Sequence, residues 1–319
     1  MQQTSTEIIG LIADIGGTNA RFALVDAGHH ILNEQTLACS DYTCPATAAT
    51  AYLQSVGVAC PKQAAFAVAT PVMGDQIEFT NSPWLFSTRA VQLALNLKQL
   101  TILNDFTALA LALPQLNADE RRAVGGETAV EGAPIGLIGP GTGLGVSGLV
   151  CSNKRWMPLQ TEGGHMTFSP TDEREWAIGQ LLWQRFGHTS LERLLSGPGL
   201  VNLYEALAQL EGWSTDSLAP ADITEQALSG QCQHCTDTLE TFCGILGTAA
   251  GNLALTLGAR GGIYIGGGIV PQLGHFFDHS TFRKRFESKG RFKAYLEPIP
   301  SWVITADNPA FRGVATALY

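Results

Sequence analysis

Residues 13–21 read Ala-Asp-Ile-Gly-Gly-Thr-Asn-Ala-Arg, and apolar runs flank them at 8–13 and 22–25. Apolar runs on both sides of a glycine pair predict strand, tight turn and strand, so we expect a β-hairpin. Glycine and asparagine are also ordinary turn residues, and a plain hairpin turn explains them as well. The small side chains let backbone N–H groups close on an anion, which makes this turn a candidate phosphate-binding segment.

The turn differs from the lysine-bearing phosphate loop. It contains no lysine, and no helix is expected directly after it, whereas that loop joins a strand to a helix. A hairpin turn of this composition resembles the first phosphate segment of the superfamily that contains sugar kinases, actin and heat-shock chaperones. The resemblance implies that the nucleotide phosphates contact Ala13, Asp14, Ile15, Gly16, Gly17, Thr18 and Asn19.

The composition is that of a soluble globular protein with room for two domains. The 319 residues are 45% hydrophobic and 15% charged, and a chain of this length can bury two cores. The formal charge of −9 argues against nucleic acid as a partner, because duplex binding needs a basic face. We therefore expect an anionic nucleotide to be held locally by backbone N–H groups, helix N-termini and Mg²⁺.

The seven cysteines are scattered and predict no disulfide framework. Residues 1–7 lack the features of a secretion signal, and no run approaches the ~20 apolar residues that span a bilayer. These features predict a cytoplasmic protein without a membrane partner. Cys232, His234 and Cys235 suggest zinc, but one Cys-x-x-Cys supplies two of the four ligands that a closed site needs. We interpret them as thiols near a helix start and predict no protein-bound metal.

Strand-like and helix-like segments alternate, which predicts an α/β protein with mixed sheets covered by helices. The expected strands are 8–13, 22–25, 31–38, 64–69, 100–103, 134–138, 146–151, 263–265 and 302–305. The expected helices are 43–56, 87–97, 172–186, 235–257 and 310–318. Ser87 is expected to cap the second of these helices; Ser169 is expected to cap the third, with Pro170 as its first residue.

Two further glycine segments follow strands. The first, at 139–145, reads Gly-Pro-Gly-Thr-Gly-Leu-Gly, and 143–148 also fits the dinucleotide pattern G-x-G-x-x-G of a nicotinamide-dependent oxidoreductase. That pattern needs a helix, and 146–151 is too β-branched, apolar and short for one. We interpret this segment as a hairpin resembling the superfamily's second phosphate segment, with Gly141, Thr142 and Gly143 as nucleotide contacts.

The other glycine segment, at 266–268, resembles the superfamily's adenosine motif, with Gly267 and Gly268 against the purine. Three glycines after a strand are in general more often a plain loop. However, the order first phosphate, Asn-Asp, second phosphate, adenosine matches the superfamily over nearly the whole chain.

Asn104 and Asp105 lie where a strand ends and an Ala/Leu-rich helix begins, the position where open α/β sheets bind ligands. A sugar hydroxyl is a poor nucleophile at neutral pH, so a carboxylate that accepts its proton is expected. Asp105 is the candidate catalytic base, and Asn104 can bind a neighbouring hydroxyl. Helix capping explains the two residue types as well.

Glu162 and His165 are separated by two glycines, which allow a tight bend that brings both side chains toward one ligand. A carboxylate and a neutral imidazole together can satisfy the donors and acceptors of a polyol. A metal site would need further ligands, and none has suitable spacing nearby. Glu192 is an ordinary surface acid by sequence.

Segments 14–21, 104–108, 162–165, 192–200 and 265–271 together resemble the bacterial glucokinases, and 195–204 is especially typical of them. The resemblance implies an α/β, two-lobed actin-like ATPase (ribonuclease H-like) fold with a central cleft. The smaller domain is expected at 1–115 plus 303–319 and the larger at 116–302.

The same resemblance implies phosphorylation of D-glucose by ATP with Mg²⁺, Asp105 as the base, and a homodimer. It places Asn104, Glu162, His165 and Glu192 on the glucose hydroxyls. The cysteine-rich zinc motif of the related ROK sugar kinases is missing, so structural zinc is not expected.

Residue types alone do not fix the sugar stereochemistry or the donor. Fructose, mannose or N-acetylmannosamine stay possible as acceptors, and polyphosphate or ADP as donors. A non-catalytic sugar-sensing protein of the same fold is the other alternative. Such relatives carry an additional DNA-binding helix-turn-helix, and no room for one is expected before residue 8.

Overall fold

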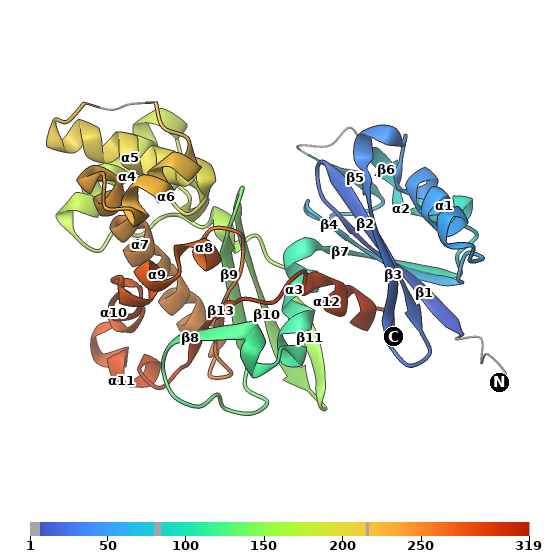
Figure 1. Ribbon diagram of the computed structural model, residues 1–319. Coiled ribbons are helices and arrows are strands. Elements are labelled where there is room, and N and C mark those ends of the chain that lie inside the picture. The colour runs from blue at the N-terminus through green and yellow to red at the C-terminus, as the bar shows by residue number, and fades with distance from the viewer. Residues whose placement is uncertain (1–6, 80–83, 215–216, 319) are drawn as a thin grey trace. The chain divides into compact units, whose positions relative to one another are not determined.

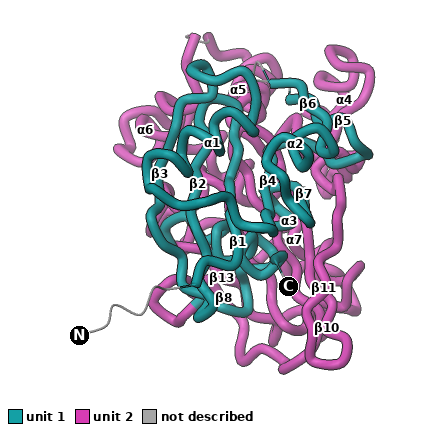
Figure 2. The backbone as a smooth tube through the Cα atoms, turned by 90° about the vertical axis from the view of Figure 1, so that its right-hand side faces the viewer, with its two compact units in different colours: residues 1–116, 306–319 teal, residues 117–305 magenta. Residues whose placement is uncertain are grey.

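The computed structural model describes residues 7–79, 84–214 and 217–318 (Figure 1). The chain forms two compact units, Met1–Leu116 with Ala306–Tyr319 and Asn117–Thr305, which are coloured separately in Figure 2. Each unit has its own sheet and its own buried core. None of the helices in the described ranges combines the length and apolar composition that a bilayer crossing requires.

The first unit is built on a five-stranded sheet in the order β3-β2-β1-β4-β7, in which β1, β4 and β7 are parallel. Its strands are β1 (Ile8–Ile15), β2 (Asn19–Asp26), β3 (Ile31–Ala38), β4 (Gln63–Val68) and β7 (Gln99–Asn104). A small second sheet pairs β5 (Gln76–Glu78) with β6 (Leu85–Ser87). The helical elements are η1 (Cys39–Asp41), α1 (Pro45–Val56), α2 (Thr88–Ala94), α3 (Asp105–Ala112), η2 (Leu113–Gln115) and α12 (Ala310–Thr316).

Both faces of this sheet are buried, because alternate side chains of the central strands enter different cores. In β4, Phe66 joins a core with Phe22 and Tyr52, while its neighbour Ala67 joins a second core with Val314 of α12. A strand covered on both faces reads as a continuous apolar run. This explains why β1 and β4 were readable from the sequence.

The second unit is built on a six-stranded sheet in the order β11-β10-β9-β12-β13-β8. Its strands are β8 (Arg121–Gly125), β9 (Ile135–Pro140), β10 (Leu144–Ser152), β11 (Arg155–Leu159), β12 (Ile263–Ile265) and β13 (Ser301–Ile304). After β13, which lies inside this sheet, the chain returns to the first unit at Ala306.

Helices share one buried core with this second sheet, and the long α7 contributes many of its buried side chains. The longer helices are α4 (Glu173–Phe186), α5 (Gly197–Glu211), α6 (Pro220–Leu228) and α7 (Gln233–Leu257). The shorter elements are η3 (Ala118–Glu120), η4 (Gly163–His165), η5 (Leu191–Arg193), α8 (Val270–Leu273), α9 (His275–His279), α10 (Phe282–Glu287), η6 (Gly290–Phe292) and α11 (Lys293–Leu296).

The two predicted helix caps have different outcomes. Ser87 caps α2, because its hydroxyl accepts a hydrogen bond from Ala90 N at 3.0 Å. The prediction for α4 is wrong: Asp172, not Ser169, is the cap, and its carboxylate accepts from Glu175 N at 2.8 Å. The Glu175 carboxylate in turn accepts from Thr171 N at 2.8 Å, which keeps residue 171 outside the helix.

Candidate functional site

The first glycine turn is the predicted β-hairpin turn, with β1 and β2 antiparallel on either side of it. Gly16 N donates to the carbonyl of Asn19 at 2.9 Å, and the carbonyl of Thr18 accepts from Cys39 N at 2.8 Å. Gly17 is half-buried and Thr18 is exposed. The turn is therefore fixed to η1 on one side and open to solvent at its tip.

Parallel pairing brings the first turn and the Asn-Asp pair to the same edge of the sheet. Ile15 at the end of β1 pairs with Val68 of β4, and Val68 pairs with Asn104 at the end of β7. Asp14 and Asp105 are close enough for their charges to interact. Of this arrangement, the sequence predicted the position of Asn104 and Asp105 at the carboxyl end of a strand.

Burial determines the electrostatics of the two carboxyl groups. It raises the pKa of Asp105 to about 6, and the negative charge of Asp14 acts in the same direction. Burial also raises the pKa of Asp14, against the opposing effect of Arg21, its partner across the hairpin. A carboxylate with a raised pKa is a stronger base than an exposed one and is still mostly ionised at pH 7.

Asn104 is the N-cap of α3. Its Oδ1 accepts hydrogen bonds from Phe106 N at 3.0 Å and Thr107 N at 3.3 Å, and its amide donates to the carbonyl of Thr70 at 3.4 Å. The capping interpretation of this residue is therefore confirmed. Capping also fixes Asp105 as the first residue of the helix, which orients its carboxyl group.

The second and third glycine segments lie side by side in the second unit, because β9 and β12 are parallel neighbours. The segment after β9 is a hairpin turn in which Gly141 N donates to the carbonyl of Gly143 at 2.8 Å. Gly267 has φ +75°, and an added Cβ would lie 2.2 Å from the carbonyl oxygen of Pro140. Only glycine allows these two segments to approach so closely.

Glu192 is bonded to the second glycine turn. Its Oε2 accepts from Leu144 N at 2.9 Å, and a Cβ on Gly143 would lie only 2.6 Å from that oxygen. The other carboxylate oxygen, Oε1, lies 4.0 Å from Nδ1 of His165. By sequence alone Glu192 was an ordinary acid, and the contact with residue 144 has no local sequence signal.

Glu162 and His165 occupy the predicted bend. The bend is η4, in which His165 N donates to the carbonyl of Glu162 at 3.0 Å, and both residues are exposed. The carboxylate that lies near the imidazole of His165 belongs to Glu192.

The predicted site residues thus form one group in each unit. The first unit contains the first glycine turn together with Asn104 and Asp105. The second contains the other two glycine segments, His165 and Glu192. Within the described ranges, no group of three or more His, Cys, Asp and Glu side chains could hold a metal ion.

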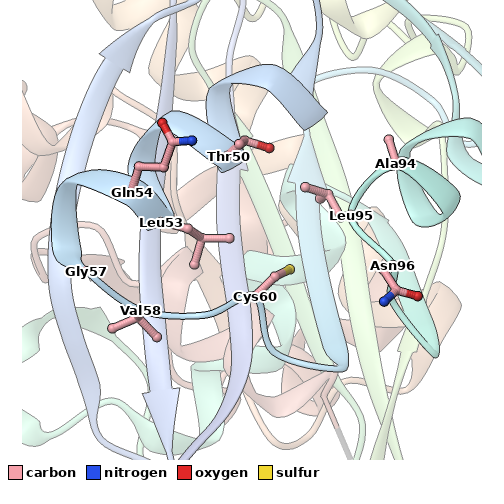
Figure 3. Close-up of a pocket in the computed structure, with 9 residues that line it drawn as sticks. All are labelled: Thr50, Leu53, Gln54, Gly57, Val58, Cys60, Ala94, Leu95 and Asn96. Carbon is pink, nitrogen blue, oxygen red and sulfur yellow. The ribbon is translucent and has the colours of Figure 1, made fainter.

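A separate pocket of about 340 Å³ lies in the first unit, next to the ends of α1 and α2 (Figure 3). Leu53 and Thr50 line it from α1, and Leu95 and Asn96 line it from the segment after α2. None of its lining residues is a predicted site residue, and none is charged. This pocket is therefore distinct from both groups.

Three kinds of comparison agree. A family model described as Glucokinase matches residues 11–319. The chain is 52% identical to a glucokinase of Aromatoleum aromaticum, over 97% of this chain and 94% of the relative. It is also 52% identical to a glucokinase of Chromobacterium violaceum, over 97% and 88%.

Solved structures show the same fold. A crystal structure of glucokinase from an Antarctic psychrotroph superposes with a TM-score of 0.88 at 37% identity, covering 97% of this chain and 98% of that one. A ROK family glucokinase from Streptomyces griseus, solved in complex with glucose and AMPPNP, superposes with a TM-score of 0.63 at 19% identity, covering 98% and 99%. These likenesses confirm the predicted α/β fold of the actin-like ATPase type.

Proposed function

The chain belongs to the glucokinase family, and from that premise we propose how its residues act in the reaction. As a member of this family, it transfers a phosphoryl group from ATP to D-glucose and forms glucose 6-phosphate. We propose Asp105 as the general base. The observation that supports this role is its buried carboxyl group at the carboxyl end of β7, with a pKa raised to about 6.

In the proposed step, Asp105 accepts the proton of the glucose 6-hydroxyl as that oxygen attacks the γ-phosphorus of ATP. The new O–P bond forms while the bond to the β-phosphate oxygen breaks, and ADP leaves with the electron pair. A base whose pKa lies near the working pH is ionised in a large fraction of the molecules and still binds a proton well. An Asp105 with an ordinary pKa would hold the proton less well.

We assign the nucleotide to the three glycine segments. Residues 13–19 and 141–143 contact phosphates through backbone N–H groups, and Gly267 and Gly268 contact the adenosine. Phosphates bound in this way need no lysine, because backbone dipoles supply the positive potential. Mg²⁺ would neutralise charge on the phosphates.

We assign the glucose hydroxyls to Asn104, Glu162, His165 and Glu192. Glu192 is the best supported of these, because the hydrogen bond from Leu144 N fixes one carboxylate oxygen and leaves the other on the side of His165. The carboxylate accepts from hydroxyls, and the imidazole can both donate and accept. A homodimer and a cytoplasmic location complete the proposal.

The test of the base is Asp105→Asn, which keeps the size of the side chain and removes its basicity. Turnover should fall about 10²-fold or more, as expected for loss of a general base, while glucose affinity by calorimetry stays within a few-fold. Turnover is measured by coupling glucose 6-phosphate to a dehydrogenase. The control is Asp41→Asn, a change at an exposed carboxylate of the same unit. Near-normal turnover of Asp105→Asn would remove Asp105 from the role.

A further inference from the structure

Helix α7 begins with a pair of cysteines that the kinase reaction does not use. Cys232 is the N-cap of this 25-residue helix, and its sulfur accepts a hydrogen bond from Cys235 N at 3.3 Å. Cys232 is half-buried between the exposed residues Gln231 and Gln233, whereas Cys235 is fully buried. The Cys232 residue is thus partly exposed to solvent, and the buried Cys235 lies next to it.

The Cys232 sulfur lies beside Cys235, so that a small movement can bring the two sulfurs within bonding distance. Residues three apart on a helix have Cβ atoms about 5–6 Å apart, and a disulfide needs about 3.5–4.5 Å. Cys232 lies outside the helix, in extended backbone with φ −131° and ψ 108°. A small rotation of this one residue can therefore shorten the distance without unwinding α7.

The surroundings hold this first turn in place. The ring of His234 stacks on Trp213 with centroids 3.6 Å apart, and Thr238 Oγ1 donates to the carbonyl of His234 at 2.8 Å. The Cys235 thiol donates to Oε1 of Gln226 at 3.8 Å. These contacts fix His234 and Cys235, so the movement that brings the two sulfurs together is left to Cys232.

The two thiols differ chemically as a nucleophile and a resolving group should. Cys232 is half-buried at the N-cap of the helix and is the more exposed residue of the pair. Burial and the adjacent Cys232 sulfur raise the pKa of Cys235, so this thiol stays protonated in the reduced protein.

We propose that Cys232 and Cys235 form a reversible dithiol–disulfide pair that exchanges with small disulfides such as oxidised glutathione. Cys232 loses its proton to solvent and its sulfur attacks one sulfur of the small disulfide; the S–S bond breaks, and the leaving sulfur takes up a proton as the first thiol. Cys235 then loses its proton and attacks the Cys232 sulfur of the mixed disulfide, which releases the second thiol. The protein loses two electrons and two protons, and the small disulfide gains them.

The chain contains its own matched control at Cys44. This residue is the N-cap of α1, but Thr47 stands where α7 has its second cysteine, and Cys44 N donates to Thr47 Oγ1 at 3.2 Å. Cys44 can undergo the first exchange step, and the threonine three positions after it has no thiol to complete the second.

The experiment incubates the full chain in buffers of varied oxidised to reduced glutathione ratio, quenches with acid and alkylates the free thiols. Mass spectrometry of the fragment that contains both residues is expected to show loss of both thiols and no glutathione. Any product at Cys44 should be a glutathione adduct. Dithiothreitol should restore both thiols, and Cys235→Ser should leave glutathione attached to Cys232.

Three outcomes would overturn the proposal: both thiols stay free in every buffer, glutathione persists on Cys232 in the unsubstituted chain, or dithiothreitol fails to reverse the change. The measurements on the unsubstituted chain decide the matter even where Cys235→Ser does not fold, because they involve no substitution. Circular dichroism of the variant shows whether its own result can be used.

Discussion

At the scale of a single residue, Asp105 is held in an environment that opposes its charge. Its pKa is about 6 in the folded chain, because of burial and the nearby Asp14, and its ordinary value is 3.8. Above pH 6 the carboxyl group is ionised in both the folded and the unfolded chain, and the folded state is destabilised. Between pH 6 and about 4 the folded chain takes up a proton that the unfolded chain does not, which relieves the destabilisation.

Asp105→Asn should therefore stabilise the fold at pH 8, by up to about 3 kcal/mol if the whole pKa difference is expressed. This advantage should shrink as the pH falls through 6 and be nearly lost near pH 4. Urea unfolding of both chains at several pH values measures it, with Asp41→Asn as the exposed control. A difference in unfolding free energy that does not change with pH would contradict the assigned environment.

Gly143 is a second residue whose role can be tested, because the Glu192 carboxylate leaves no space for a side chain there. A methyl group there would lie 2.6 Å from Oε2 of Glu192, so Gly143→Ala must displace that carboxylate and break its bond with Leu144 N. We expect the KM for glucose to rise by about tenfold, as for the loss of one or two hydrogen bonds, with a smaller change in kcat. Steady-state kinetics at saturating ATP measure this. Gly179→Ala, in α4, is the matched control, because its backbone has no positive φ and an added Cβ would make only an ordinary contact with Phe168 at 3.5 Å. An equal effect there would exclude the local explanation.

At the scale of elements, most of the strands that the sequence predicted are buried over most of their length. The parallel strands β1, β4 and β7 and the two glycine hairpins were predicted, because apolar runs and glycine turns are local signals. The strands β5, β6, β8 and β11 were not, since they are partly exposed and have only three to five residues, too few for a period to stand out. The cap of α4 was placed at Ser169 because proline suits the first position of a helix, and only the bonds among Thr171, Asp172 and Glu175 show that the helix begins later.

The residues of the candidate site also differ in whether the sequence could predict their positions. The Asn-Asp pair and the glycine segments were readable because they directly follow strands. The partner of His165 was not, because the Glu192 carboxylate reaches it through a hydrogen bond to residue 144, far away in the sequence. A contact of this kind follows from tertiary packing and leaves no periodicity to detect.

At the scale of the whole molecule, the two units differ in how they are assembled from the chain. The second is continuous over Asn117–Thr305, whereas the first needs α12 from the far end, which supplies Phe311 and Val314 to its core. We expect 117–305 to fold alone and 1–116 to fail. Circular dichroism and thermal unfolding of both fragments test this. A cooperative transition in 1–116 would show that α12 is dispensable.

The position of α12 also has a consequence for synthesis on the ribosome. The strands of the first sheet emerge early, but the helix that covers one of its faces is translated after every element of the second unit. Until then Ile12, Ala65 and Ala67 lack the cover that Val314 provides. The nascent chain must therefore carry an uncovered apolar face through most of its translation, which makes this sheet the part of the newborn protein with the greatest need of a chaperone.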